Sequence, residues 1–151
     1  GGFMAHQYVT FSLEEQLYAV DITLVNEITE IKDITKIPIS KDYMEGVLYL
    51  RGKVIPIINL KRKMNIEIKR TSNQILVIEY GDKQIGLIID HAKDVKVIDD
   101  QSIEKLESNI YSKLGSNIKC IIKDTGNQLI LIIDIPTMFL SIDENEQLLL
   151  A

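Results

Sequence analysis

The sequence is poor in the residues that small proteins use for cross-linking and metal binding. Among 151 residues there are one cysteine, two histidines and no tryptophan. The single cysteine, Cys120, permits no disulfide within the chain, which suits a reducing compartment such as the cytoplasm. A structural zinc site needs about four Cys, His or carboxylate ligands, and His6 and His91 lie far apart in the sequence. We therefore expect neither a metal nor another cofactor.

Catalytic and phosphate-binding motifs are also missing. No GxGxxG, GxSxG or HExxH pattern occurs. Gly46, Gly52 and Lys53 do not form a P-loop, because the glycine spacing is wrong and Val54 stands where the motif needs Ser or Thr. Nothing in the sequence places an acid and a base across one cleft. We expect a protein that is not an enzyme.

Long apolar runs and an excess of positive charge are absent. The net charge of −5 disfavours non-specific binding to nucleic acid or to an anionic membrane. No run approaches the length of a membrane-spanning helix, so direct membrane insertion is not expected. Residues 1–5 are expected to be a cloning remnant or a disordered terminus, since Gly1-Gly2-Phe3 precedes Met4. Met4 near the start and the short tail after Leu140 favour a free-standing protein.

Hydrophobic residues make up 46% of the sequence, with isoleucine and valine prominent among them. These β-branched side chains favour strands, and the chain length fits one domain or a tight pair of small lobes. Alternation and turn residues predict strands separated by short helices and turns. The expected strands are Tyr8–Leu13, Leu17–Ile22, the two arms of Gly46–Leu60, Gln74–Tyr80, Gln84–Asp90, Val95–Ile98, Ile118–Lys123 and Leu129–Ile135. A short helix is expected from Pro136 to Leu140, and Asn109–Asn117 is expected to be a loop.

The pattern of hairpins occurs twice. Tyr8–Asp21 is similar to Ile75–Asp90, because each reads strand, polar turn and strand ending in aspartate. Gly46–Leu60 is similar to Ile118–Ile135, because each ends in an apolar run around an Asn or Asp. Closing a small sheet into a barrel removes its exposed edges. The repeat therefore predicts two small β barrels side by side.

The central stretch Gly46–Leu60 carries an arginine between two apolar arms. Glycine at Gly52 allows the chain to reverse there. Arg51 is then either the solvated tip of a hairpin or a buried side chain that needs a carboxylate partner. Glu27 lies among apolar residues in Val25-Asn26-Glu27-Ile28 and is the candidate partner. If this pair is an interior clamp, that is, a buried ion pair, removing one partner would strongly destabilise the fold, because the remaining charge would be buried without a partner.

These residues resemble the signature of the CheW family, the coupling proteins of bacterial chemotaxis. The matching positions are Gly46, Leu50-Arg51-Gly52, Pro56 and Asn59-Leu60, and Tyr49 departs from the family, which usually has asparagine there. The resemblance runs from about Tyr8 to about Leu140. It implies an all-β fold of two SH3-like five-stranded barrels, with short helices at the crossings and at the C-terminus. The expected domain is 6–140, with a first lobe at about 20–66, a second at about 74–133, termini that pack across, and a tail at 141–151.

The resemblance also implies a function. CheW proteins are non-enzymatic cytoplasmic adaptors that bind the CheW-like regulatory domain of the histidine kinase CheA and the helical tip of methyl-accepting chemotaxis receptors. Glu27 and Arg51 match an ion pair that supports the fold and the partner surface, and Gly46 and Gly52 are candidates for the kinase interface. The residues expected to line an apolar groove for the receptor are Val9, Ile22, Val25, Ile28 and Ala92.

Two other interpretations stay open. The chain could be a CheW-like module of a larger signalling protein, such as the regulatory domain of the kinase or a receiver-fused coupler. A small β-barrel domain that binds a ligand is the alternative of another class, although the missing catalytic groups argue against an enzyme of this kind. Any of the groove residues could instead belong to an ordinary core.

Overall fold

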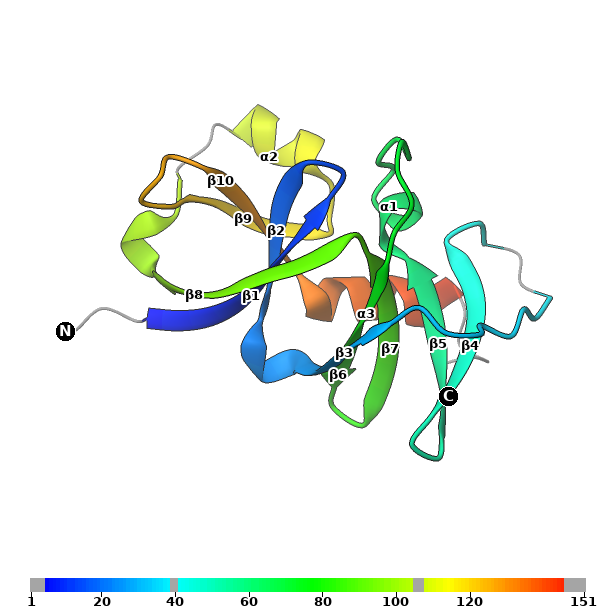
Figure 1. Cartoon of the computed structure of the whole chain (residues 1–151). Coiled ribbons are helices and arrows are strands. Elements are labelled where there is room, and N and C mark those ends of the chain that lie inside the picture. The colour runs from blue at the N-terminus through cyan, green and yellow to red at the C-terminus, as the bar shows by residue number, and fades with distance from the viewer. Residues whose placement is uncertain (1–4, 39–40, 105–107, 146–151) are drawn as a thin grey trace.

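The computed structural model describes residues 5–38, 41–104 and 108–145, and in this part of the chain ten strands form two five-stranded sheets side by side (Figure 1). The two sheets confirm the β architecture predicted from the sequence. We call them sheet A and sheet B. Sheet A contains β1 (Ala5–Leu13), β2 (Gln16–Asp21), β8 (His91–Asp99), β9 (Ile118–Lys123) and β10 (Leu129–Ile133). Sheet B contains β3 (Val25–Glu30), β4 (Met44–Leu50), β5 (Lys53–Asn59), β6 (Gln74–Tyr80) and β7 (Lys83–Ile89).

The two sheets have the same strand arrangement. Sheet A runs in the order β8-β1-β2-β10-β9 and sheet B in the order β3-β6-β7-β5-β4. In each sheet two hairpins meet through one parallel pair, β2 with β10 and β7 with β5. The hairpin β1–β2 therefore corresponds to β6–β7, and β9–β10 corresponds to β4–β5. These are the pairs of segments whose sequences are similar.

Each sheet combines strands from both halves of the chain, an arrangement that we call the hairpin exchange. The boundaries expected for the two lobes are therefore wrong. Strands β6 and β7 were expected in the second lobe at 74–133, but they complete sheet B together with β3, β4 and β5. The hairpin β1–β2 correspondingly completes sheet A, whose other strands follow β7. Sheet B is thus one continuous segment, from β3 to β7, inserted between β2 and β8 of sheet A, whereas the expected boundaries divided it after residue 66.

Three apolar clusters explain why most strands are hydrophobic on both faces. Leu48, Ile55, Ile57, Ile75, Val77 and Ile88 form one cluster on sheet B, and Ala19, Ile98, Ile122, Ile130 and Ile132 form another on sheet A. The third, which we call the shared cluster, lies between the sheets and unites side chains from both. Its buried members are Phe11, Leu13, Tyr18, Val20, Tyr43, Met44, Ile58, Leu60, Leu76, Ile78, Ile85, Leu87, Ile89, Ile133, Ile135, Met138, Phe139 and Ile142.

The helices follow capping residues at the ends of corresponding strands. Asn59 caps α1 (Leu60–Lys63) by accepting a hydrogen bond from the Arg62 amide, and the Asp134 carboxylate accepts one from the Thr137 amide at the start of α3 (Ile135–Asn145). Such caps satisfy amides that have no partner within the helix. Because α3 buries Met138, Phe139 and Ile142 in the shared cluster, it continues past Leu140 to Asn145. The expected tail from 141 is wrong for its first five residues, and 146–151 lie outside the described residues.

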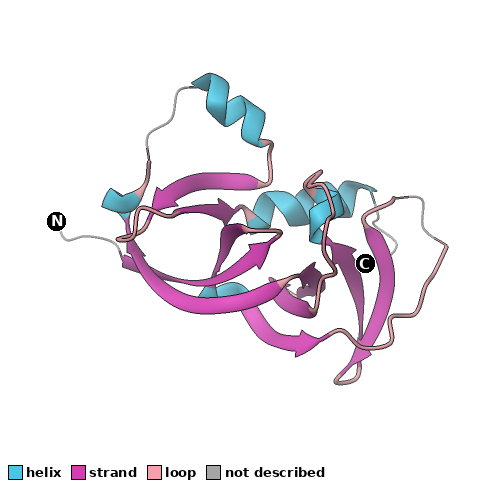
Figure 2. Cartoon of the chain, turned by 45° about the horizontal axis from the view of Figure 1, so that its top comes forward, coloured by secondary structure: helices cyan, strands magenta, loops and turns pink. Residues whose placement is uncertain are grey.

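Two 3-10 turns and the helix α2 (Ser108–Leu114) lie outside the sheets (Figure 2). The 3-10 turns η1 (Ile22–Leu24) and η2 (Asp100–Ser102) follow β2 and β8. The helix α2 (Ser108–Leu114) occupies a stretch predicted to be a loop, so that prediction is wrong. Strand β8 is longer than the expected Val95–Ile98. Within the residues that the structure describes, no helix has the length and apolar character needed to cross a membrane.

Candidate functional site

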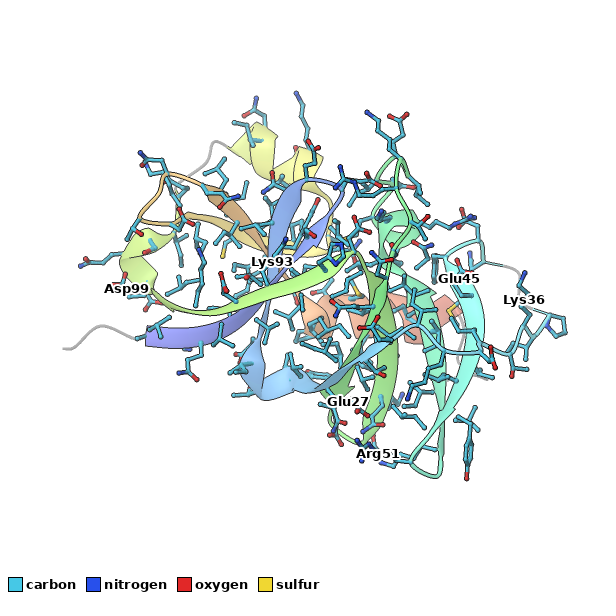
Figure 3. All side chains as sticks on the ribbon, in the orientation of Figure 1. Glu27, Lys36, Glu45, Arg51, Lys93 and Asp99 are labelled. Atoms are coloured by element: carbon cyan, nitrogen blue, oxygen red, sulfur yellow. The ribbon has the colours of Figure 1, made fainter. Side chains whose placement is uncertain are left out.

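The turn between β4 and β5 presents Arg51 to a carboxylate on the edge strand β3. Arg51 and Gly52 form the turn and both have positive φ, 51° and 82°. The Arg51 guanidinium donates from Nε to Glu27 Oε1 at 3.1 Å and from Nη2 to Glu27 Oε2 at 3.2 Å. Figure 3 shows the two residues together at one end of sheet B. The pairing of Glu27 with Arg51, one of the two alternatives open from the sequence, is present in the structure.

The surroundings of the pair differ from the interior clamp that was considered. The side chain of Arg51 is 76% exposed and that of Glu27 is 21% exposed. The hydrogen bonds from Arg51 hold the pKa of Glu27 below its usual value, because they favour the ionised carboxylate. An exposed ion pair stabilises a fold only slightly. The bidentate pair therefore fixes the shape and charge of a surface more than it stabilises the core.

The two candidate glycines have different roles in the structure. A Cβ on Gly46, which has φ of 139°, would lie 2.2 Å from the backbone oxygen of Thr35. Gly46 is buried there, and it allows Thr35 to exchange backbone hydrogen bonds with Val47. Gly52 is exposed, and a Cβ there would meet nothing within 4 Å. A direct contact of either glycine with a kinase stays a prediction.

Sequence reasoning missed an apolar pair on the same hairpin. Tyr49 and Val54 lie directly opposite each other on β4 and β5, and they are 73% and 64% exposed. Opposed residues share one face of a sheet, so the two side chains form a small apolar surface next to the Arg51 turn. In the sequence, Tyr49 differs from the family pattern but gives no indication of a surface role. Its exposure depends on the sheet topology and has no signal in the sequence.

The five residues predicted for the groove come from both sheets and from the link between them. Val9 on β1 is buried, Ile22 in η1 is half-buried, and Ile28 on β3 is 40% exposed. Val25 at the start of β3 and Ala92 near the start of β8 are half-buried, and both pack against the shared cluster. The structure thus brings Val25 and Ala92 to one cluster, while a groove enclosed by all five residues stays a prediction.

Strand register adds one residue to this set. Val95 on β8 lies directly opposite Val9, and Val9 lies opposite Val20 of the shared cluster. On sheet B, Ile28 lies opposite Leu76, which also belongs to the shared cluster. Val95 is 53% exposed. The two edge strands therefore extend the buried apolar layer to the surface, through Val95 on sheet A and Ile28 on sheet B.

The described residues offer no obvious metal site. Within the ranges 5–38, 41–104 and 108–145, no group of three or more His, Cys, Asp or Glu side chains is placed to hold a metal ion. Cys120 lies half-buried on β9, and burial raises the pKa of its thiol, which lowers its reactivity. The exposed features of the β4–β5 hairpin and of the two edge strands are an ion pair and apolar side chains, which suit contacts with another protein.

Comparisons with known proteins agree with this geometry. The chemotaxis protein CheW of Thermotoga maritima is 30% identical over 130 residues, which cover 85% of this chain and 84% of that protein. The chemotaxis protein CheW of Bacillus subtilis is 30% identical over 128 residues, covering 83% and 81%. The crystal structure of the scaffolding protein TtCheW from Thermoanaerobacter tengcongensis matches with a TM-score of 0.75 and 34% identity, covering 87% of this chain and 90% of that chain. A family model described as the CheW-like domain matches residues 7–143, and the chain therefore belongs to the CheW-like domain family.

Proposed function

We propose that the protein is a non-enzymatic chemotaxis adaptor, which couples methyl-accepting chemotaxis receptors to the histidine kinase CheA in the cytoplasm. The family match over residues 7–143 carries this proposal. The names of the relatives support it, since they are a chemotaxis protein and a scaffolding protein. We further propose that each sheet closes into an SH3-like barrel. The Glu27–Arg51 pair supports this closure on sheet B, because it connects the edge strand β3 to the turn of the other edge hairpin.

The β4–β5 hairpin is the proposed surface for the CheW-like regulatory domain of the kinase. It presents an oriented guanidinium at Arg51 beside the exposed apolar pair Tyr49 and Val54. Tyrosine and arginine are enriched among the residues that dominate binding energy at interfaces. The carboxylate of Glu27 holds the guanidinium in place, so less side-chain freedom is lost on binding. Gly52 supports this surface by leaving the turn free of side-chain bulk.

The apolar rim between the edge strands is the proposed groove for the receptor tip. Ile22, Val25, Ile28, Ala92 and Val95 form this rim, with the buried Val9 beside Val95 on the neighbouring strand. Helices commonly dock by placing apolar side chains from one face into an apolar groove. Exposed apolar side chains that continue a buried cluster commonly mark a surface that binds another protein. This arrangement supports a helical partner on the rim and a different partner on the β4–β5 hairpin.

Two variants test the separation of the surfaces. In Arg51→Ala, binding to the kinase regulatory domain should weaken at least tenfold, about 1.4 kcal/mol, while binding to a receptor-tip fragment stays within about twofold of wild type. Ile28→Asp should show the reverse, because it places a charge on the apolar rim. Each variant controls for the other, and titration calorimetry measures both affinities. Wild-type protein that binds neither partner would contradict the proposed function, and variants that lose both partners equally would contradict two separate surfaces.

A further inference from the structure

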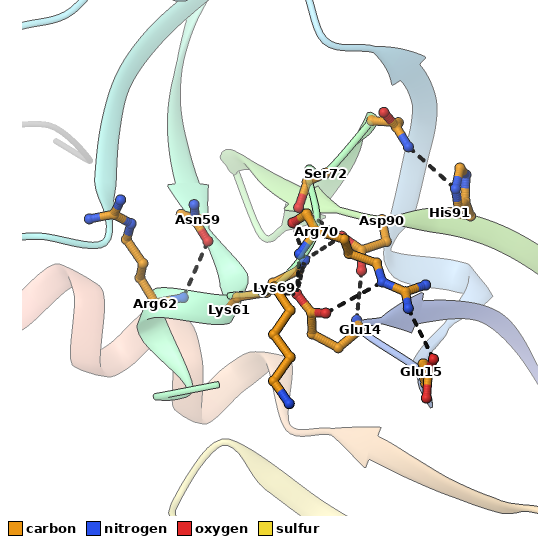
Figure 4. A network of polar contacts seen from close by, with 11 residues as sticks. Glu14, Glu15, Asn59, Lys61, Arg62, Lys69, Arg70, Ser72, Asp90 and His91 are labelled. Carbon is orange, nitrogen blue, oxygen red and sulfur yellow. Dashed lines mark hydrogen bonds and ion pairs between the residues drawn. The ribbon is translucent and has the colours of Figure 1, made fainter. Parts of the chain in front are cut away.

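Lys61 in α1 is the one lysine whose side chain is fully buried among the described residues. Its Nζ lies 2.6 Å from Glu14 Oε1 and 2.7 Å from Asp90 Oδ1, and it donates to the backbone oxygen of Arg70 at 3.0 Å (Figure 4). We call Lys61, Glu14 and Asp90 the Lys61 cluster. A buried ammonium requires partners for its charge and its three protons, and the two carboxylates together with the Arg70 backbone oxygen provide three acceptors.

The Lys61 cluster joins the two sheets. Glu14 belongs to the β1–β2 turn of sheet A, whereas Lys61 follows β5 of sheet B. Asp90 lies where the chain leaves β7 of sheet B and enters β8 of sheet A. Its carboxylate also accepts hydrogen bonds from the Glu14 amide at 2.6 Å and from the Ser72 hydroxyl at 2.9 Å. Each carboxylate therefore connects an element of one sheet to an element of the other.

The backbone at Glu14 indicates that its carboxylate is needed at this position. Glu14 has φ of 58°, a left-handed conformation that glycine adopts most readily. At the corresponding position of the β6–β7 turn the chain has Gly81, with φ of 65°. The chain thus uses a strained glutamate where its own second hairpin uses glycine. Besides Lys61, the carboxylate accepts hydrogen bonds from the amides of Lys69 and Arg70, which offset the strain.

The corresponding junction, between the β6–β7 turn and α3, is built differently from the junction between the β1–β2 turn and α1. Lys61 is the second residue after the cap Asn59, and Pro136 is the second residue after the corresponding cap Asp134. Between the β6–β7 turn and α3, the ring centroids of Tyr80 and Phe139 lie 5.5 Å apart, beside a hollow of about 510 Å³ that Leu140 also lines. An ionic connection at one junction and apolar packing at the other indicate that the Lys61 cluster is a specific feature rather than a consequence of the repeat.

We infer that Glu14, through the Lys61 cluster, is a positioning residue that fixes how sheet A is oriented on sheet B. The shared cluster holds the sheets together through apolar burial, which is itself non-directional. The Lys61 cluster adds directional contacts at the edge of the same interface. Orientation matters for docking, since the proposed receptor rim combines Val95 of sheet A with Val25 and Ile28 of sheet B. This last step rests on the proposed function, whereas the orientation itself does not.

The variant Glu14→Gly tests the orientation directly. It removes the carboxylate, relaxes the left-handed backbone and leaves Lys61 paired with Asp90, so the protein should remain folded. Spin labels at Lys53→Cys on sheet B and Gln128→Cys beside sheet A, in a Cys120→Ser background, report the distance between the sheets by pulsed EPR. We expect a broader or displaced distance distribution in Glu14→Gly.

Glu15→Gln is the matched control, because it changes the neighbouring turn residue, whose side chain is 85% exposed, and should leave the distribution unchanged. An unchanged distribution in Glu14→Gly would overturn the inference.

Binding then tests the link to docking. Glu14→Gly should lose at least tenfold in affinity for the receptor-tip fragment, which needs both sheets. Its affinity for the kinase regulatory domain, which is proposed to use sheet B alone, should stay within about twofold of wild type. Equal receptor affinities in Glu14→Gly and wild type would overturn the link. If wild-type protein binds neither partner, the proposed function fails, and the EPR result still decides the inference on orientation.

Discussion

Gly86 lies in the middle of β7, where β7 runs parallel to β5 and Gly86 is paired with Ile57. A Cβ at this position would lie 2.6 Å from Ile57 Cδ1 and 2.8 Å from Ile75 Cγ2. Both neighbours are fully buried in the apolar cluster of sheet B. At the corresponding position of sheet A, Ala19 is paired with Ile132. One sheet therefore accommodates a methyl group where the other does not.

The substitution Gly86→Ala should destabilise the protein by about 1–3 kcal/mol, because a packed core must shift to admit the methyl group. Equilibrium unfolding in urea measures the change in free energy. Gly126→Ala is the control, since its Cβ would meet only Asp124 Oδ1 at 3.5 Å, an ordinary contact. Equal stabilities of Gly86→Ala and Gly126→Ala would contradict close packing of Ile57 and Ile75 around Gly86.

Individual residues also show how far the sequence could be interpreted. Glu27 and Arg51 were predicted as partners from their types and from the family pattern, and the pair is present. Their exposure was not predictable, because it depends on which strands lie at a sheet edge. Val95 was missed for the same reason: within Asp94-Val95-Lys96-Val97 only the pairing with Val9 reveals which face the side chain occupies.

The β1–β2 turn and α1 form an element whose stability depends on pH. The hydrogen bond from Lys61, with those from the Lys69 and Arg70 amides, lowers the pKa of Glu14 from 4.5 to about 2. A carboxyl group with a lowered pKa stabilises the folded state above the pKa that it has when unfolded. This contribution is fully present above about pH 5 and is lost as the pH falls from about 4.5 towards 2.

Acid should therefore destabilise the wild-type protein more than the variant Glu14→Gln. The free energy of unfolding, measured in urea at pH 5, 4 and 3, should fall less steeply in Glu14→Gln than in wild type. A slope should remain, because Lys96 lowers the pKa of Asp124 and Arg51 lowers that of Glu27. In Glu15→Gln, which removes a largely exposed carboxylate, we expect a slope close to that of wild type. Identical slopes in Glu14→Gln and wild type would contradict a role for Glu14 in acid unfolding.

At the scale of elements, clear alternation and turn residues predicted the hairpins well. Tyr8–Leu13 and Gln74–Tyr80 lie within strands, because one face or both faces are buried in the clusters. The elements that sequence reasoning missed lack such a pattern. Strand β8 exposes most of its first seven residues and is specified by pairing with β1, and α2 (Ser108–Leu114) is short, with seven residues.

At the scale of the whole molecule, the hairpin exchange makes each sheet a joint product of both halves of the chain. Sheet A needs β1 and β2 from the first half and β8, β9 and β10 from the second, and sheet B has the reciprocal composition. The repeated hairpins were visible in the sequence, since they share local turn and strand patterns. Their assignment to sheets was not, because the parallel pairs β2 with β10 and β5 with β7 join segments that are distant in the chain.

This exchange predicts that neither half folds alone. Fragments 5–67 and 68–145, divided in the exposed connection after α1, would each leave a sheet without its central hairpin and would expose the apolar residues of the shared cluster. We expect each fragment by itself to give poorly dispersed amide NMR spectra and no cooperative unfolding transition. Co-expressed fragments should associate one to one and recover a dispersed spectrum, since together they supply all strands of both sheets. A dispersed spectrum and cooperative unfolding from either fragment alone would contradict the exchange, because that half would then build its own complete sheet.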